Sequence, residues 1–279
     1  MNPLTLAYSP CPNDTFIFTP WVEGHLPDAP PVVERLDDIE TLNRAALAGE
    51  LDVAKVSFHA YGHLRDRYCL LRSGGALGRG CGPLVVARQS FPEAVLASKT
   101  VAIPGRLTTA ALLVRLFAPD LKDENVRVMT FDQILAAVRD GEVDAGVIIH
   151  ESRFTYPRYG LTQVVDLGEW WERETGHAIP LGGIAMRRDL GDDRIRRTER
   201  ALAASVDYAH AHPDTVWPTV RRHAQEMEDD VMRQHIALYV NDFTRDYGAE
   251  GERAIRYLLD TAEQLGVIPH SEKPLFVPA

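Results

Sequence analysis

The sequence has few cysteines and no long apolar run. It contains three cysteines, Cys11, Cys69 and Cys81, and none of them belongs to a CxxC pair. A disulfide framework or a zinc ribbon is therefore not expected, and a reducing, cytoplasmic environment fits this usage best. The longest apolar stretches, such as 110–114 and 145–149, are far shorter than the roughly 20 residues of a membrane span, so we expect no membrane association.

Basic residues are fewer than acidic ones. Lysine and arginine together number 30 against 40 aspartates and glutamates, which gives a formal net charge of −10. This balance argues against a nucleic-acid partner, because such binding depends on a basic surface. It permits a small anionic substrate, since a local site can be positive on a negative protein. Residues 1–14 lack the basic segment and apolar core of a signal peptide, which again favours a cytoplasmic protein.

The most informative feature that is present is a repeated pattern. Residues 49–59 read GELDVAKVSFH, and residues 141–150 read GEVDAGVIIH. Apolar residues at helical spacing precede both copies, and the glycine of each copy stands where a left-handed helix cap is expected. The apolar stretch that follows is typical of a buried parallel strand. A match this short can be coincidental, but the flanking segments agree in the same order.

Each half of the repeat predicts the order β-α-β-α-β. Strands are expected at 4–9 and 32–36 in the first half, and at 100–105 and 126–131 in the second. Two such units predict an α/β protein with two lobes, each a mainly parallel sheet flanked by helices.

The two lobes are expected to be unequal. Residues 180–190 are predicted to form a strand that returns to the first lobe. The larger lobe would comprise 1–98 plus 186–279 and the smaller lobe 99–185, with crossovers that act as a hinge and a ligand cleft between the lobes. Helices are expected after the returning strand, at 192–211, 213–225, 228–246 and 249–266.

In open parallel sheets, ligands bind outside the carboxyl ends of the strands. The predicted strand ends include Ser9, the segment Lys55-Val56-Ser57 and His150, so these residues are candidates for a substrate site. Lys55 interrupts an otherwise apolar strand, and burying its amine without a negative partner would be costly. It therefore lies either at an exposed strand end or facing the ligand.

Two polar groups stand at predicted helix starts. Asn13, Asp14 and Thr15 follow the first strand, and Thr108 and Thr109 follow a strand of the second half. Free backbone N–H groups and the helix dipole at such positions favour a bound carboxylate or phosphate, and hydroxyls add donors. Helix capping explains the same residues, and the two roles are compatible.

His150 is the candidate for catalysis. It follows a run of aliphatic residues and ends the second copy of the repeat. A neutral imidazole can remove a proton at physiological pH. A lone histidine is more often structural, but its position at a strand end favours a general base. Its counterpart His59 lies two residues past Ser57, so its place at the strand end is less clear.

Other features support weaker alternatives. Cys11 lies at a strand-to-helix turn that would favour a thiolate, but no basic residue is near it in the sequence. His59 and His63 have i, i+4 spacing without a third ligand, which makes a metal site a weak interpretation. The glycine-rich stretch 72–84 matches no nucleotide-binding motif and is expected to form a hinge or a cleft-lining loop. The tandem tryptophans at 170–171 can pack a planar ligand or simply a core.

Five stretches together form a pattern that is also found elsewhere. They resemble the 1,4-dihydroxy-6-naphthoate synthase family, and the resemblance covers most of residues 1–190. It implies a periplasmic-binding-protein-like fold and a place in the futalosine route to menaquinone. The stretches are SPCPNDTFIF (9–18), KVSFHAY (55–61), LRSGGALGRGCGPLV (71–85), IPGRLTTAALLVRL (103–116) and IIHESRFTYPRYGL (148–161).

The resemblance implies a carbon–carbon lyase. Members of that family convert cyclic dehypoxanthinylfutalosine to 1,4-dihydroxy-6-naphthoate and release a three-carbon product, with no metal or organic cofactor. The family's histidine base corresponds to His150, and its substrate-contacting segments correspond to 55–57 and to Thr108-Thr109. We therefore expect proton abstraction by His150 as general base, followed by C–C cleavage.

One alternative function stays open at this point. A non-catalytic solute-binding protein or sensor of the same fold would present the same kind of cleft. The lack of a signal peptide and of an attached DNA-binding module counts against it. The oligomeric state, monomer or homodimer, does not follow from the sequence.

Overall fold

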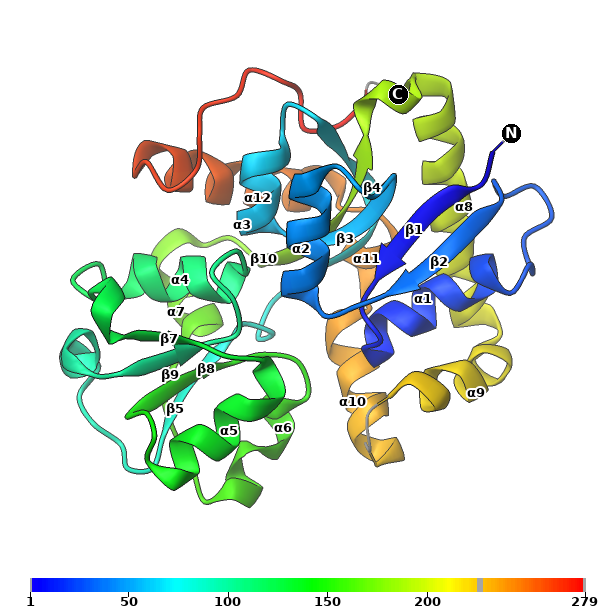
Figure 1. Ribbon diagram of the computed structural model, residues 1–279. Helices are drawn as coiled ribbons and strands as arrows, with labels where there is room; N and C mark the ends of the chain where they lie inside the picture. The colour runs from blue at the N-terminus through cyan, green and yellow to red at the C-terminus, as the bar shows by residue number, and fades with distance from the viewer. Residues whose placement is uncertain (1, 225–227, 278–279) are drawn as a thin grey trace. The chain divides into compact units, whose positions relative to one another are not determined.

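The computed structural model of the chain describes residues 2–224 and 228–277. The chain divides into two compact units, one formed by Met1–Gly78 with Pro180–Ala279 and the other by Arg79–Ile179. Each unit contains a five-stranded sheet with helices packed on it (Figure 1). The α/β class expected from the repeat is confirmed.

The first unit is built on a sheet with the strand order β2-β1-β3-β10-β4. Its strands are β1 (Leu4–Tyr8), β2 (Val32–Leu36), β3 (Val53–Ser57), β4 (Tyr68–Gly78) and β10 (Ile179–Arg187). Its helices are α1 (Pro12–Val22), α2 (Ile39–Ala48), α3 (Phe58–Leu64), α8 (Asp192–Ala211), α9 (Pro213–His223), α10 (Asp229–Tyr239), α11 (Asp242–Arg245) and α12 (Gly248–Gln264), with a 3₁₀ turn at Arg188–Leu190.

The second unit is built on a sheet with the order β7-β6-β8-β5-β9. In Figure 1, α4 and α7 lie on one side of this sheet and α5 and α6 on the other. Its strands are β5 (Leu84–Ala87), β6 (Val101–Ile103), β7 (Val126–Val128), β8 (Ala145–Ile148) and β9 (Thr162–Asp166). Its helices are α4 (Thr109–Phe117), α5 (Phe131–Asp140), α6 (Ser152–Thr155) and α7 (Leu167–Thr175), with 3₁₀ turns at Glu93–Ser98, Asp123–Asn125 and Tyr156–Tyr159.

The two copies of the repeat fold alike. Helix α2 ends at Gly49 with φ 80° and ψ 18°, and α5 ends at Gly141 with φ 79° and ψ 19°. Both glycines adopt the left-handed conformation that a residue with a Cβ avoids, which is why glycine occupies both positions. The strands that follow, β3 and β8, pair in parallel with β1 and β6 respectively. The repeat therefore positions two equivalent strand ends, one in each unit.

Each sheet also contains antiparallel pairing. β10 pairs antiparallel with β3, and β5 pairs antiparallel with both β8 and β9. Residues 84–87 thus belong to the second sheet and 180–185 to the first, which differs from the lobe boundaries expected at 98 and 186. Hydrophobic pattern marks a short buried strand but does not reveal its pairing partner.

The core of the first unit lies between its sheet and helices α1, α8 and α9. Because side chains alternate along a strand, Leu4, Leu6 and Tyr8 of β1 point to the same face and join this core. Helix α1 is buried almost throughout, with apolar residues such as Phe16, Ile17 and Phe18 in the core and polar residues at its start. In the described parts of the chain, none of the helices combines the length and apolar character that crossing a bilayer requires.

Two local predictions need correction, and one lies partly outside the described residues. The helix expected at 228–246 is split, because Val240 is extended and Asn241 starts α11 with a capping box that includes Thr244. The glycine-rich stretch expected as a loop is mostly strand β4. The predicted end of one helix at residue 225 falls in the undescribed segment 225–227.

The glycines of β4 allow close packing rather than a loop. A Cβ at Gly75 would overlap the ring and hydroxyl of Tyr247. That hydroxyl is buried and has no hydrogen-bond partner among the described residues. Gly75 thus lets the strand fit under Tyr247, and Gly74, with a left-handed φ of 81°, lies close to Ile184 and Leu202.

We expect Gly75→Ala to lower the free energy of unfolding by about 1–3 kcal/mol, because the added methyl group overpacks the core. Tyr247→Phe removes the unpaired buried hydroxyl and should leave the protein at least as stable as wild type. The double variant should recover part of the loss. Urea denaturation of all three variants measures this. Additive effects in the double variant would contradict the proposed contact.

Candidate functional site

The predicted site residues of the first unit lie at the carboxyl ends of β1 and β3. Each of them is more than nine-tenths buried. The set comprises Ser9, Asn13, Asp14, Lys55, Val56 and Ser57.

Lys55 forms a buried ion pair with Asp14. Its Nζ lies 2.8 Å from Asp14 Oδ1 and 3.1 Å from the carbonyl oxygen of Gly74. Lys55 is 5% exposed, so the interpretation as an exposed strand end is wrong. A buried pair repays its desolvation only when further hydrogen bonds satisfy both charges.

Asp14 receives those further hydrogen bonds from its neighbours. Ser9 Oγ donates to Asp14 Oδ2 at 2.7 Å, and Asn13 Nδ2 donates to Asp14 Oδ1 at 2.9 Å. The carboxylate therefore accepts from Lys55, Ser9 and Asn13 together. These side chains satisfy one another and hold the end of β1, the start of α1 and the end of β3 in one arrangement.

His235 of α10 extends this network, and sequence reasoning missed it. Its Nε2 lies 2.9 Å from Asn13 Oδ1, and the residue is fully buried. Because the Asn13 amide nitrogen donates to Asp14, its oxygen must accept, which assigns the proton to Nε2 of His235. The sequence does indicate that His235 is buried, because it shares the helical spacing of the apolar residues Val231, Met232 and Tyr239.

Ser57 is held by a second residue that the sequence did not reveal, Asn43 of α2. The Ser57 N–H donates to Asn43 Oδ1 at 2.9 Å, and Asn43 Nδ2 donates to Ser57 Oγ at 3.2 Å. Since Ser57 Oγ accepts from Asn43, its own hydroxyl hydrogen is left to donate. It finds no acceptor within the described ranges of the chain.

Thr108 and Thr109 begin α4 in the second unit. Thr108 is its N-cap, and its hydroxyl accepts from the Ala111 N–H at 3.2 Å and donates to the Gly105 carbonyl at 2.8 Å. Thr109 is the first helical residue and is 3% exposed. The capping role of Thr108 is therefore confirmed, and a ligand role for the pair stays a prediction.

His150 follows β8 in a strained backbone conformation. Its φ is 56°, and it is the one non-glycine residue with positive φ in the described chain. The left-handed region is disfavoured for residues with a Cβ, although histidine enters it more often than most. The Phe131 ring packs edge-on against the partly exposed imidazole, with 5.1 Å between centroids. Strain of this kind costs about 1–3 kcal/mol and clusters at functional sites.

The weaker alternatives receive structural explanations. Cys69 and Cys81 are buried, and burial raises the pKa of their thiols to about 11 and about 12 respectively. Cys11 is also buried, at the start of α1. Trp171 is buried beside Trp170, whose ring meets that of Phe117 edge-on at 5.4 Å, so the pair packs within the second unit.

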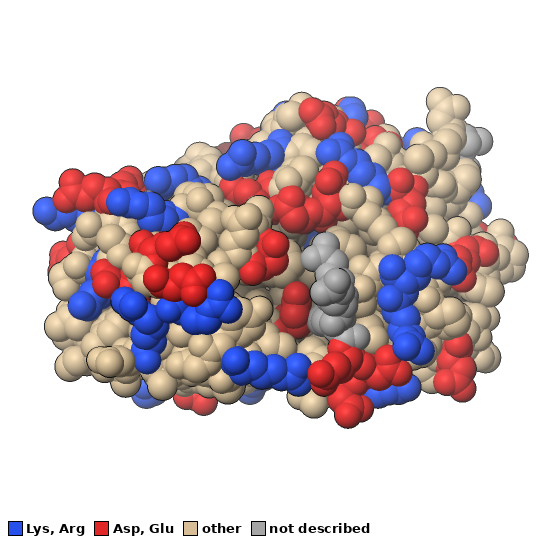
Figure 2. All heavy atoms as spheres, turned by 60° about the horizontal axis from the view of Figure 1, so that its bottom comes forward, with Lys and Arg blue, Asp and Glu red and all other residues tan. Residues whose placement is uncertain are grey.

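Metal-binding groups do not cluster in the described residues. The rings of His59 and His63 lie 5.6 Å apart. Within 2–224 and 228–277, no group of three or more histidine, cysteine, aspartate or glutamate side chains is placed to hold a metal ion. Figure 2 shows acidic and basic side chains interspersed over one face of the molecule.

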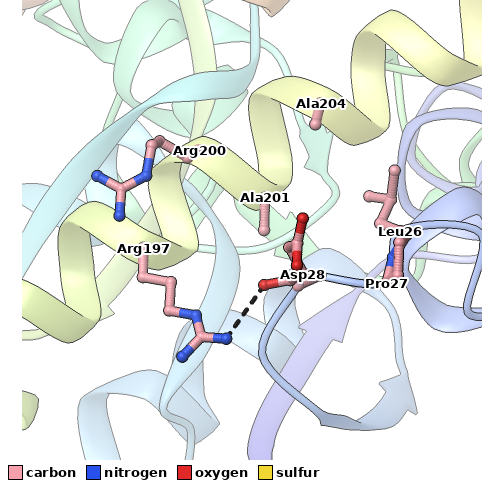
Figure 3. A pocket seen from close by; sticks show the side chains of 8 residues that line it. Leu26, Pro27, Asp28, Arg197, Arg200, Ala201 and Ala204 are labelled. Atoms are coloured by element: carbon pink, nitrogen blue, oxygen red, sulfur yellow. Dashed lines mark hydrogen bonds between the residues drawn. The ribbon is translucent and has the colours of Figure 1, made fainter.

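One surface pocket of the first unit lies apart from the predicted site residues. It has a volume of about 400 Å³ and lies between α8 and the 26–29 loop. Arg197 donates to the backbone oxygen of Asp28 at 3.2 Å, and the Arg200 guanidinium points away from Asp28 (Figure 3). Since Asp28 shares this lining with the arginines, the pocket has no clear preference for anions.

Comparison with known proteins identifies the family. A family profile described as menaquinone biosynthesis matches residues 4–264. The chain belongs to this menaquinone biosynthesis family. It is 53% identical to a protein of Thermus thermophilus over 99% of this chain and 100% of that protein. It is 49% identical to a protein of Streptomyces coelicolor over 95% of both chains. Both relatives are named 1,4-dihydroxy-6-naphtoate synthase, so the chain is an enzyme of the lyase class.

Solved structures confirm the predicted fold. A crystal structure of an Archaeoglobus fulgidus protein matches with a TM-score of 0.89 and 35% identity, covering 95% of this chain and 98% of that one. An alkanesulfonate-binding protein from Xanthomonas axonopodis, solved with MOPS bound, matches with a TM-score of 0.71 and 12% identity, covering 96% and 94%. The latter shows the fold alone, which is that of periplasmic binding proteins.

We expect Lys55→Met to lower the free energy of unfolding by about 3–5 kcal/mol, because it leaves the Asp14 carboxylate buried without its cation. The double variant Lys55→Met/Asp14→Asn removes that charge and should be more stable than Lys55→Met alone. Urea denaturation at neutral pH measures the differences. As a control, Arg173→Met breaks an exposed pair with Glu174 and should barely change stability. Equal stability of Lys55→Met and wild type would show that the pair is unimportant.

Proposed function

We propose that the chain converts cyclic dehypoxanthinylfutalosine to 1,4-dihydroxy-6-naphthoate in the cytoplasm, as a step of menaquinone biosynthesis. The observation that carries the proposal is the near full-length identity of 53% and 49% to two proteins named for that product. The strained, partly exposed His150 supports it from the structure. The substrate is a small anion, and no cofactor takes part in the proposed reaction.

In the proposed mechanism His150 acts as general base. It removes a proton from the sugar-derived ring of the substrate, and the electron pair shifts so that a C–C bond breaks. Formation of the aromatic naphthoate makes the step favourable. The edge-on contact with Phe131 orients the imidazole, and an oriented base loses less entropy when it reaches the reactive geometry.

The other predicted residues bind or position the substrate. The Ser57 oxygen already accepts a hydrogen bond from Asn43, so its hydroxyl hydrogen can donate to a substrate oxygen. Thr108 and Thr109 present the start of α4 to an anionic group. Val56 contributes an apolar contact. Ser9, Asn13, Asp14 and Lys55 act mainly by fixing the strand ends that carry the binding groups.

We expect His150→Asn to lower turnover by about 10²–10⁴-fold, which is the usual contribution of a general base. Asparagine tolerates the left-handed conformation, so this variant removes the imidazole without adding the strain that alanine would bring. Release of the naphthoate from the cyclic substrate measures turnover.

A matched control is available for this experiment. His177 is the other histidine of the second unit, and His177→Asn should keep turnover within a few fold of wild type. Near-normal turnover of His150→Asn would refute the assignment of the base. Tight substrate binding by wild type without any product would instead favour a solute-binding or sensor protein.

A further inference from the structure

Glu151 follows His150 directly and presents an unusual carboxyl group. The side chain is partly buried, and its Oε2 is sealed from solvent without a hydrogen-bond partner among the described residues. Its backbone is regular, with φ −66° and ψ −20°, and it stands at the start of α6. The orphaned oxygen is therefore not explained by backbone strain at Glu151 itself.

The surroundings of Glu151 favour the neutral carboxylic acid. Burial is the main cause that raises its pKa, and the field of Asp132 on α5 raises it further, while the residue's own N–H lowers it. No lysine or arginine of the described chain forms an ion pair with it. His150 is the neighbouring titratable group along the chain. A buried carboxylate oxygen without donors is costly, which favours the protonated form of Glu151 more than that of an exposed glutamate.

We propose that Glu151 is a second catalytic residue, the general acid that works beside His150. This inference rests on the function proposed above. It pairs two neighbouring residues whose environments differ: a partly exposed imidazole that can accept a proton, and a partly buried carboxylic acid that can donate one. Neighbouring titratable groups whose environments favour opposite protonation states are a common basis for assigning acid and base roles.

The proton balance of the reaction calls for such a donor. His150 takes one proton from the substrate, a C–C bond breaks, and the atom that receives the released electron pair must gain one proton. Glu151 supplies that proton and becomes a carboxylate. After product release, a proton passes from the His150 imidazolium through solvent to Glu151, which restores both groups. No oxidant, reductant or added water is needed.

We expect Glu151→Gln to lower turnover by about 10²–10⁴-fold, because the amide fits the same space but cannot act as an acid. In wild type, turnover should rise as His150 loses its proton and fall at higher pH as Glu151 loses its own. The alkaline fall should disappear in Glu151→Gln. Glu151→Asp keeps an acid and should recover part of the turnover. The control Glu142→Gln changes an exposed carboxylate of the same unit and should behave as wild type.

A purely structural role gives a different result. Glu151→Gln would then keep turnover within a few fold of wild type and retain the same pH profile, which would overturn the proposal. If the glutamine variant does not fold, Glu151→Asp decides in its place, since a shift of the alkaline fall is expected only for a proton donor, and an unshifted fall would overturn the proposal.

Infrared difference spectra give a readout that is independent of turnover. Wild type minus Glu151→Gln should show a protonated carboxyl band at neutral pH that Glu142→Gln leaves unchanged. An active wild type with an ionised Glu151 would overturn the donor role alone. A wild type that forms no naphthoate would overturn the proposed function and the donor role together.

Discussion

The buried ion pair between Lys55 and Asp14 is the interaction on which the first unit's strand ends depend. It joins β3 to α1, and the hydrogen bond from Lys55 to the Gly74 carbonyl adds β4. Three segments that are far apart along the chain therefore meet at one charged contact. Such a contact is stable only when every charge is satisfied, which is why Ser9 and Asn13 also donate to Asp14.

The buried polar groups that surround this pair need hydrogen-bond partners of their own. The Asn13 amide donates to Asp14, and its buried carbonyl oxygen needs a donor of its own, which His235 of α10 supplies. Asn43 plays a comparable part for Ser57, where one side-chain amide both donates and accepts. A fully connected polar network specifies one arrangement, because any displaced member leaves a buried group unpaired.

Two neighbouring residues of the second unit, His150 and Glu151, contrast with this network. His150 is held at a positive φ, and the neighbouring Glu151 carboxyl has a buried oxygen without a described partner. Both features cost folding free energy. Satisfied networks suit residues that position a substrate, whereas unsatisfied or strained groups suit residues that exchange protons with it.

The fold alone does not distinguish these roles. A protein that binds alkanesulfonates shares the architecture at 12% identity, so the same scaffold serves other ligands. Function therefore has to be argued from the residues of the site and not from the fold. Family membership rests instead on the match over residues 4–264 and on the near full-length similarity to the two lyases.

The sequence by itself determined the local elements and the repeat. The cap glycines Gly49 and Gly141, the apolar strands and the position of His150 at a strand end follow from short-range signals, because helix spacing and turn chemistry act over a few residues. Only the tertiary structure decided how Lys55 is paired, since its partner lies 41 positions away, and that His235 reaches Asn13 across 222 positions. It also decided the antiparallel placement of β5 and β10 and made a strand of the glycine-rich stretch under Tyr247. These outcomes depend on which surfaces pack together, and a pattern of neighbouring residues does not contain that information.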